Sequence, residues 1–191
     1  MQDSRIDTWS DLQDFLACEK RLYSPLFNHK RVYFRFTHQH QYMLYRYVRL
    51  LRISEYLINT GSGNPIKKIL FWIVERRRNN LGNKLGICIN QNVFGKGLLI
   101  DHIGSITVNP FARVGRNCHI HGSCCIGKGG HSEKSPIIGN NVNIGWGCVI
   151  IGGIQIADGV RIGANSVVTH SIEEKGSTWV GIPAQCIRNN E

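Results

Sequence analysis

Two histidines near the middle of the chain have the residue type and surroundings for acid–base chemistry. His102 follows Asp101 directly, and His131 lies within the glycine-rich stretch 128–136. The imidazole of histidine changes its charge near neutral pH, so it can take a proton from one group and return it to another. His102 and His131 are therefore candidate catalytic residues, and the elements around them must make them accessible.

Those elements repeat every six residues. Aliphatic side chains recur at this spacing from Val108 to Ile126 and again, on the same phase, from Ile138 to Val168. An amphipathic helix has a period of 3.6 residues and drifts against six, so it cannot produce this pattern. The ten positions on one phase are Val108, Val114, Ile120, Ile126, Ile138, Ile144, Ile150, Ile156, Ile162 and Val168.

We interpret the repeat as a prism-shaped parallel β-helix. Each unit supplies one short strand and one corner, three units form one coil, and coils stack at roughly 4.8 Å. The aliphatic residue of each unit points inward, and glycine, asparagine and aspartate turn the corners. Cys118, Cys124 and Cys148 share one phase of the repeat, which predicts small buried residues rather than a disulfide or a metal site.

The repeat is broken at two places, and each break contains one of the two histidines. Ile100 and Val108 are eight residues apart instead of six, so Asp101 and His102 fall in a small insertion. The stretch 128–136 carries a polar residue at its expected aliphatic position and is predicted to leave the prism as a loop. Departures from a regular repeat are where functional residues concentrate.

The first part of the chain is predicted to be helical. Ser10 is expected to cap a first helix, which Pro25 ends. Apolar residues at three- and four-residue spacing predict a second helix at 41–59. Pro65 suits the first position of a third helix, expected to run over 66–80 with Arg76, Arg77 and Arg78 in its last turn.

Composition divides the chain near the same place. Of the 21 glycines, 19 follow residue 81. The net charge of the whole chain is +10, and most of the positive charge lies in residues 1–86, which carry 15 Lys and Arg against 7 Asp and Glu. We therefore expect an α-helical segment at 1–86 and a mainly β domain at 87–191. No apolar run approaches the roughly 20 residues of a membrane span, and no secretory signal is evident, so a cytoplasmic location is expected.

The second half resembles the left-handed β-helix acyltransferases, and its motif order is similar to the serine acetyltransferase type. The resemblance implies transfer of an acetyl group from acetyl-CoA to a hydroxyl, with no metal. It also implies that His102, beside Asp101, is the general base and that His131 bonds the acceptor or shares that role. The resemblance rests on Ile100-Asp-His102, Val114-Gly, the loop with His131, Ile138-Gly-Asn-Asn-Val-Asn-Ile144-Gly, Gly163-Ala-Asn-Ser-Val-Val168 and Val180-Gly-Ile-Pro183-Ala.

The same resemblance implies where the donor binds and how chains assemble. Acetyl-CoA is expected along the last coils, at Trp146, Ala164, Thr169 and Arg188. Related enzymes form sites in clefts between the prisms of a trimer, which implies a homotrimer here. Doubling of that trimer through the N-terminal helices stays open.

Departures from the family pattern concern the acceptor. Serine acetyltransferases carry an Asp upstream of the Asp-His pair and an Arg before the loop histidine, whereas this chain has no carboxylate in 87–91 and has Gly130. Alignment on Pro136 instead places Ser135 and Lys134 at the loop positions. We therefore expect closer similarity to acetyltransferases of polysaccharide gene sets, with a sugar hydroxyl as acceptor. The alternative is a serine O-acetyltransferase that makes O-acetylserine for cysteine biosynthesis.

Two other classes fit less well. A metal lyase on this fold needs three converging histidines, but His119 and His121 flank inward-facing Ile120 and are interpreted as surface residues. The basic N-terminal part suits contact with an anionic glycan or a membrane surface. Nucleic acid is disfavoured because no nucleic-acid-binding motif accompanies the charge.

Overall fold

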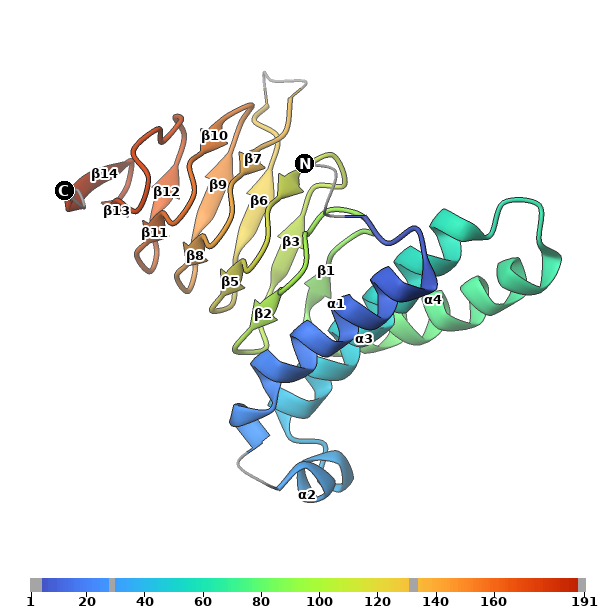
Figure 1. Cartoon of the computed structure of the whole chain (residues 1–191). Helices are drawn as coiled ribbons and strands as arrows, with labels where there is room; N and C mark the ends of the chain where they lie inside the picture. Colours follow the sequence, from blue (N-terminus) through green and yellow to red (C-terminus); the bar gives the residue numbers. More distant parts are fainter. Residues whose placement is uncertain (1–4, 28–29, 131–133, 189–191) are drawn as a thin grey trace.

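A computed structural model describes residues 5–27, 30–130 and 134–188. It consists of a helical segment packed against one end of a parallel β-helix (Figure 1). The helical segment contains α1 (Trp9–Tyr23), a short 3₁₀ turn η2 (Pro25–Phe27), α2 (Arg31–Phe36), α3 (His40–Thr60) and α4 (Pro65–Leu85). The first strand begins two residues after α4.

The start of α1 differs from the prediction, because Thr8 rather than Ser10 caps the helix. The Thr8 hydroxyl accepts a hydrogen bond from the main chain of Asp11 at 3.1 Å, and the Asp11 carboxylate accepts one from the main chain of Thr8 at 2.7 Å. This reciprocal pair satisfies two donors that the start of a helix leaves open. The end of α1 before Pro25 agrees with the prediction.

The last helix begins at Pro65, as predicted, but runs five residues beyond its expected end at Asn80. It continues because Leu81 and Leu85 are buried in the core, and it stops where Gly86 takes a left-handed φ of 73°. Arg76, Arg77 and Arg78 therefore lie inside the helix and not in its last turn.

The strands form three sides of a prism. Side A contains β1 (Ile87–Cys88), β3 (Ile106–Val108), β6 (Cys125–Gly127), β9 (Val149–Ile151) and β12 (Val167–Val168). Side B contains β4 (Arg113–Val114), β7 (Ile137–Ile138) and β10 (Gln155–Ile156). Side C contains β2 (Leu99–Ile100), β5 (His119–Ile120), β8 (Asn143–Ile144), β11 (Arg161–Ile162), β13 (Thr178–Gly181) and the antiparallel β14 (Ala184–Arg188).

All ten aliphatic positions of the six-residue pattern are buried, which confirms the predicted lattice. The strand register also locates the two insertions. Ile138 pairs with Ile156, 18 residues later, whereas Ile100 pairs with Ile120, 20 later, and Ile120 with Ile144, 24 later. The two extra residues belong to the insertion after β2, and the six extra residues belong to the loop between β6 and β7.

Buried polar contacts fix the helices against the first coils. The main-chain N–H of Ile100 donates to the hydroxyl of Tyr23 at 2.9 Å, directly before Asp101. Arg52 is fully buried and pairs with Glu19 and Glu55, and it also donates to two main-chain carbonyls of the first coil. These contacts join α1 and α3 to the coil that carries the insertion after β2.

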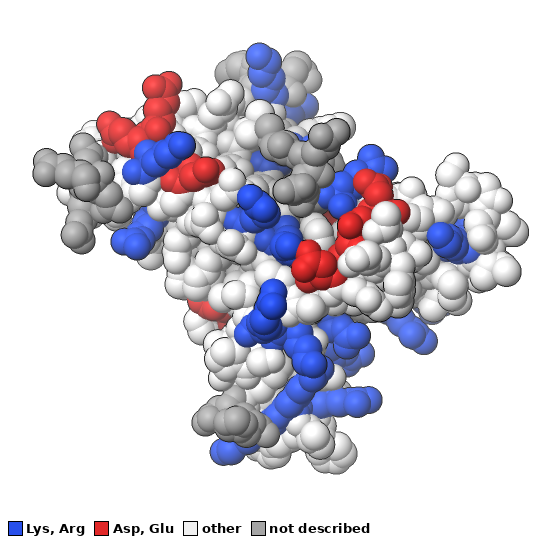
Figure 2. Space-filling model, viewed as in Figure 1, with Lys and Arg blue, Asp and Glu red and all other residues white. Residues whose placement is uncertain are grey.

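Positive side chains gather at one end of the helical segment. Figure 2 shows Lys and Arg over the lower part of that segment, around the end of α1 and around α2. The exposed residues there are Lys20, Arg21, Lys30, Arg31 and Arg35. Within the part of the chain that the structure describes, no helix is long and apolar enough to cross a membrane.

Candidate active site

The insertion after β2 places His102 at the corner where the chain passes from side C to side A. Its ring stacks on that of His40, with centroids 5.9 Å apart and an interplanar angle of 29°. The ring of Trp146 lies edge-on to it, with centroids 6.0 Å apart. Together with Ile103, these residues line an open cavity of about 460 Å³. The candidate base therefore faces a concave surface that a small substrate can reach.

His40 is a site residue that the sequence pattern did not reveal. It is the first residue of α3, so it belongs to the helical segment and not to the repeat. Burial and the neighbouring His102 lower the pKa of His40, which favours the neutral ring. A neutral His40 ring places no positive charge against the ring of the candidate base.

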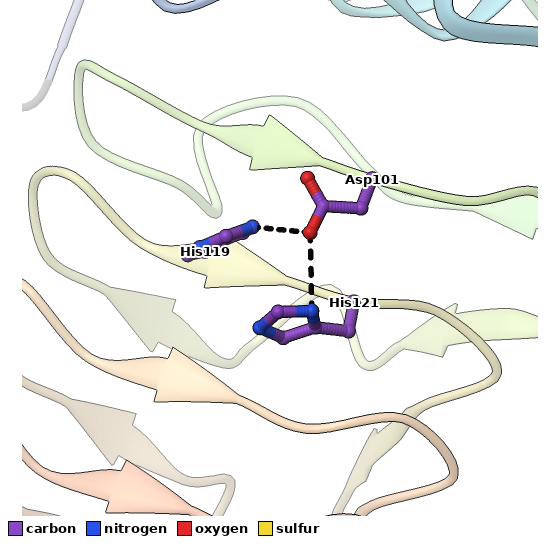
Figure 3. A group of neighbouring side chains, drawn as sticks. All are labelled: Asp101, His119 and His121. Carbon is purple, nitrogen blue, oxygen red and sulfur yellow. Dashed lines mark hydrogen bonds and ion pairs between the residues drawn. The ribbon is translucent and has the colours of Figure 1, made fainter.

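The side chain of Asp101 contacts His119 and His121 and not His102, its neighbour in the sequence. Its Oδ2 lies 2.7 Å from Nε2 of His119 and 3.0 Å from Nδ1 of His121 (Figure 3). Among the described residues, no hydrogen bond joins Asp101 to His102. Burial raises the pKa of Asp101, but the hydrogen bond from His119 and the charges of His119, His121 and His102 outweigh burial and hold it below its usual value. Asp101 thus contributes negative charge near His102 without orienting its ring.

Two of the four expected acetyl-CoA residues share the corner of His102. Trp146 follows β8 and Ala164 follows β11, so they occupy equivalent places in neighbouring coils. Both are exposed, and Trp146 also contacts His102. This corner therefore brings together the candidate base and part of the expected donor site.

The other expected site residues lie elsewhere. Thr169 follows β12 and the loop at 128–136 follows β6, so both lie at the corner between sides A and B. Figure 1 shows the end of β6 and the start of β7 at the edge opposite the turn between β2 and β3. Arg188 belongs to β14, where only its main chain is described, and His131 lies outside the described residues. A single chain consequently does not bring His102 together with Thr169 or with the described ends of the loop, 128–130 and 134–136.

A larger hollow lies on side B, away from His102. It measures about 1250 Å³, and Arg5, Arg113, Arg116 and Asp158 are among the residues that line it. None of the predicted catalytic or donor-binding residues in the described part of the chain lines it. The smaller cavity at His102 is therefore the better candidate for the reaction, because it contains the acid–base group.

Residues 135–170 match a family model described as "Bacterial transferase hexapeptide (six repeats)". The match covers successive coils above the loop, where the buried aliphatic residues stack most regularly. The parallel β-helix and this match together indicate a hexapeptide-repeat fold.

Comparison with individual proteins identifies the family more closely. The chain is 32% identical over 128 residues to the serine acetyltransferase of Helicobacter pylori, covering 65% of this chain and 74% of that protein. Its structure is similar to that of soybean serine acetyltransferase, with a TM-score of 0.60 and 27% identity. The similarity covers 75% of this chain and 58% of the soybean chain. It is also similar to the structure of the Brucella abortus serine acetyltransferase in complex with coenzyme A, with a TM-score of 0.60 and 26% identity. That similarity covers 75% of this chain and 55% of the Brucella chain. The chain belongs to the serine acetyltransferase family.

The chain spans less than two thirds of the length of these two solved structures and 38% of the Synechococcus elongatus serine acetyltransferase. The comparisons confirm the expected left-handed β-helix behind a helical segment, and the matching relatives are serine acetyltransferases, which agrees with the expected class of enzyme. The expected closer similarity to polysaccharide acetyltransferases is not supported, because these relatives favour the serine alternative.

Proposed function

We propose that this chain is an O-acetyltransferase that moves an acetyl group from acetyl-CoA to the hydroxyl of L-serine. The observation that carries the proposal is the position of His102 in a corner cavity between His40 and Trp146. Family membership supports the choice of substrates. One solved relative is a complex with coenzyme A, and the soybean relative has been solved with serine.

The proposed reaction needs one proton acceptor. His102 takes the proton of the serine hydroxyl while the oxygen attacks the thioester carbonyl carbon. The carbon–sulfur bond then breaks, and His102 returns the proton to the leaving thiolate of coenzyme A. The products are O-acetylserine and free coenzyme A, and the base ends in its starting protonation state.

The serine carboxylate requires a positive partner, and the loop between β6 and β7 and the neighbouring strand β4 offer one each. Lys134 lies two residues before Pro136, at the position of the family's arginine when the alignment rests on Pro136. Arg113 lies alongside, because its main-chain N–H donates to the Pro136 carbonyl at 3.1 Å. The hydroxyl of Ser135 donates to the side chain of Asn109 at 3.0 Å and adds a neutral polar group there. Cationic partners of this kind recognise carboxylates.

The complete site is proposed to form between the chains of a homotrimer. In one chain, side A separates His102 from the loop and from Thr169. A neighbouring prism that presents its loop edge to the corner of His102 unites the two halves. Light scattering at micromolar concentration tests this assembly, and a fully active monomer would contradict it.

A sugar hydroxyl is the second candidate acceptor. Two departures from the family pattern favour it. Residues 87–91 contain no carboxylate where the family has an Asp, and Gly130 stands in place of the family's arginine. A neutral sugar can be held by uncharged hydrogen bonds, whereas a buried carboxylate without a partner is costly.

The deciding experiment measures acetyl-CoA consumption with L-serine and with a panel of oligosaccharides. Efficiency with serine above about 10⁴ M⁻¹s⁻¹ supports the proposal, and activity on sugars alone selects the second candidate. His102→Ala is expected to lower the rate by about 10²–10⁴. His38→Asn is the matched control, because His38 is exposed with a φ of 55°, which asparagine also adopts. Near-normal turnover of His102→Ala would reject His102 as the base.

A further inference from the structure

A second group of polar side chains lies next to the candidate base. His119 and His121 flank inward-facing Ile120, so both rings project from side C, with their centroids 4.3 Å apart. Asp101 reaches both rings from the neighbouring coil (Figure 3). One ligand atom from each of these three residues lies within 4.8 Å of the other two.

Asn143, on the next coil, determines how the two rings carry their protons. Its Oδ1 lies 3.0 Å from Nε2 of His121, and its Nδ2 lies 3.3 Å from Nδ1 of His119. A carboxamide has an acceptor on one side and a donor on the other, so it selects opposite tautomers in two neutral rings. Whichever way the amide is turned, one neutral ring gives Asp101 a proton and the other gives it a bare nitrogen.

A bare nitrogen beside a carboxylate oxygen is unfavourable unless a second proton on the ring or a metal cation lies between them. Two imidazoles and one carboxylate are also a donor set that zinc and related first-row ions accept. We propose that Asp101, His119 and His121 bind a divalent transition-metal ion of the Zn²⁺ class.

Asp101 is already close to the distance from each histidine that such an ion requires. Nitrogen and oxygen ligands about 2.0–2.1 Å from a tetrahedral Zn²⁺ lie roughly 3.3 Å apart. The present separations from Asp101, 2.7 Å and 3.0 Å, therefore need to widen by only a few tenths of an ångström. The outer ring nitrogens are already held by Asn143, as ligating histidines usually are by a second partner.

Solvent can deliver the ion and complete its coordination. The side chains of Asp101, His119 and His121 are 21%, 29% and 36% exposed. Water can therefore occupy the positions that the three residues leave open. The inference does not depend on the identity of the acetyl acceptor, so its failure leaves the proposed function untouched.

The test is calorimetric titration of Zn²⁺ into the full-length, metal-stripped chain. We expect one ion per chain in the wild type. Asn143→Ala should weaken binding by about 10–100-fold, and His119→Ala and His121→Ala should weaken it further. His170→Ala is the matched control, because His170 is an exposed histidine after β12, and it should bind as the wild type does. Circular dichroism of each variant checks that the fold is kept.

Co²⁺ distinguishes this site from binding by cysteines. The proposed ligands should give weak visible bands without the intense near-ultraviolet band of thiolate coordination. The proposal is overturned if the wild type binds no Zn²⁺, or if the Co²⁺ spectrum shows thiolate ligands. It is equally overturned if folded His119→Ala and His121→Ala bind Zn²⁺ as tightly as the wild type.

Discussion

The indole of Trp146 lies directly on the backbone of Gly122, so closely that a Cβ atom at position 122 would come within 2.7 Å of its Cε3. The same indole extends over Gly104 of the preceding coil and meets the ring of His102. Gly122 has a φ of 144°, a conformation that side chains rarely adopt. The Trp146 ring can lie beside the candidate base because Gly122 has no side chain.

Gly122→Ala is therefore expected to displace Trp146 and lower kcat/KM for acetyl transfer by about 10–100-fold, since small displacements in a reaction site are costly. Gly127→Ala is the control, because the nearest atom to a Cβ there is 3.8 Å away. It should retain activity. Normal kcat/KM in a folded Gly122→Ala variant would show that the indole position is unimportant.

Arg52 is expected to be essential for stability. It lies 2.7 Å from Glu19 and 2.9 Å from Glu55, and all three side chains are buried. Arg52→Ala leaves both carboxylates without a cation, which should lower the free energy of unfolding by about 3–5 kcal/mol. Urea denaturation measures this loss.

The exposed pair of Lys96 and Asp14 provides the comparison for Arg52. Their contact is as short, at 2.6 Å, but both side chains are partly or largely exposed to solvent. Lys96→Ala should change the free energy of unfolding by less than about 1 kcal/mol. Equal losses in the Lys96 and Arg52 variants would contradict the role assigned to burial.

The cysteines should differ sharply in reactivity. Cys118 and Cys148 are buried, and burial raises the pKa of Cys148 to about 11, whereas Cys88 is exposed. Because the thiolate is the reactive form, a maleimide reagent should label Cys88 quickly and the buried pair only after denaturation. Mass spectrometry of the labelled peptides provides the measurement. Rapid labelling of Cys118 in the folded protein would be incompatible with a closed prism.

The six-residue repeat made the β-helix predictable, because each buried aliphatic residue must return to the same side of the prism. The helix limits were less predictable. Thr8 and Asp11 form a capping pair that removes the role expected of Ser10. Burial of Leu81 and Leu85 extends α4, and that burial depends on packing against the coils, which helix propensity does not contain.

The site was predictable only where it interrupts the repeat. His102 lies in the insertion after β2, as the spacing indicated, and Trp146 joins it at the same corner. His40 comes from the helical segment, so no periodicity relates it to His102. Contact of Asp101 with His119 and His121 depends on the 20-residue register between β2 and β5, which is set by how coils stack.

Two carboxylates share one guanidinium in the buried cluster, which makes the cluster sensitive to pH. Arg52 can neutralise only one of Glu19 and Glu55, and no described residue bonds to Oε2 of Glu19. Burial therefore outweighs the attraction of Arg52 and raises the pKa of Glu19 to about 7. The folded chain binds this proton more tightly than the unfolded chain, where the pKa lies near 4.5.

The stabilisation from this proton should be complete below about pH 4.5 and lost as the pH rises through about 7. The free energy of unfolding is therefore expected to fall by about 3 kcal/mol between about pH 5 and pH 8.5. Glu19→Gln keeps the shape but has no titrating proton, so most of this slope should disappear, while Asp14→Asn at an exposed position should keep it. Urea denaturation across this pH range is the measurement. A wild-type profile that stays flat, or a Glu19→Gln profile as steep as the wild type, would mean that Glu19 remains ionised beside Arg52.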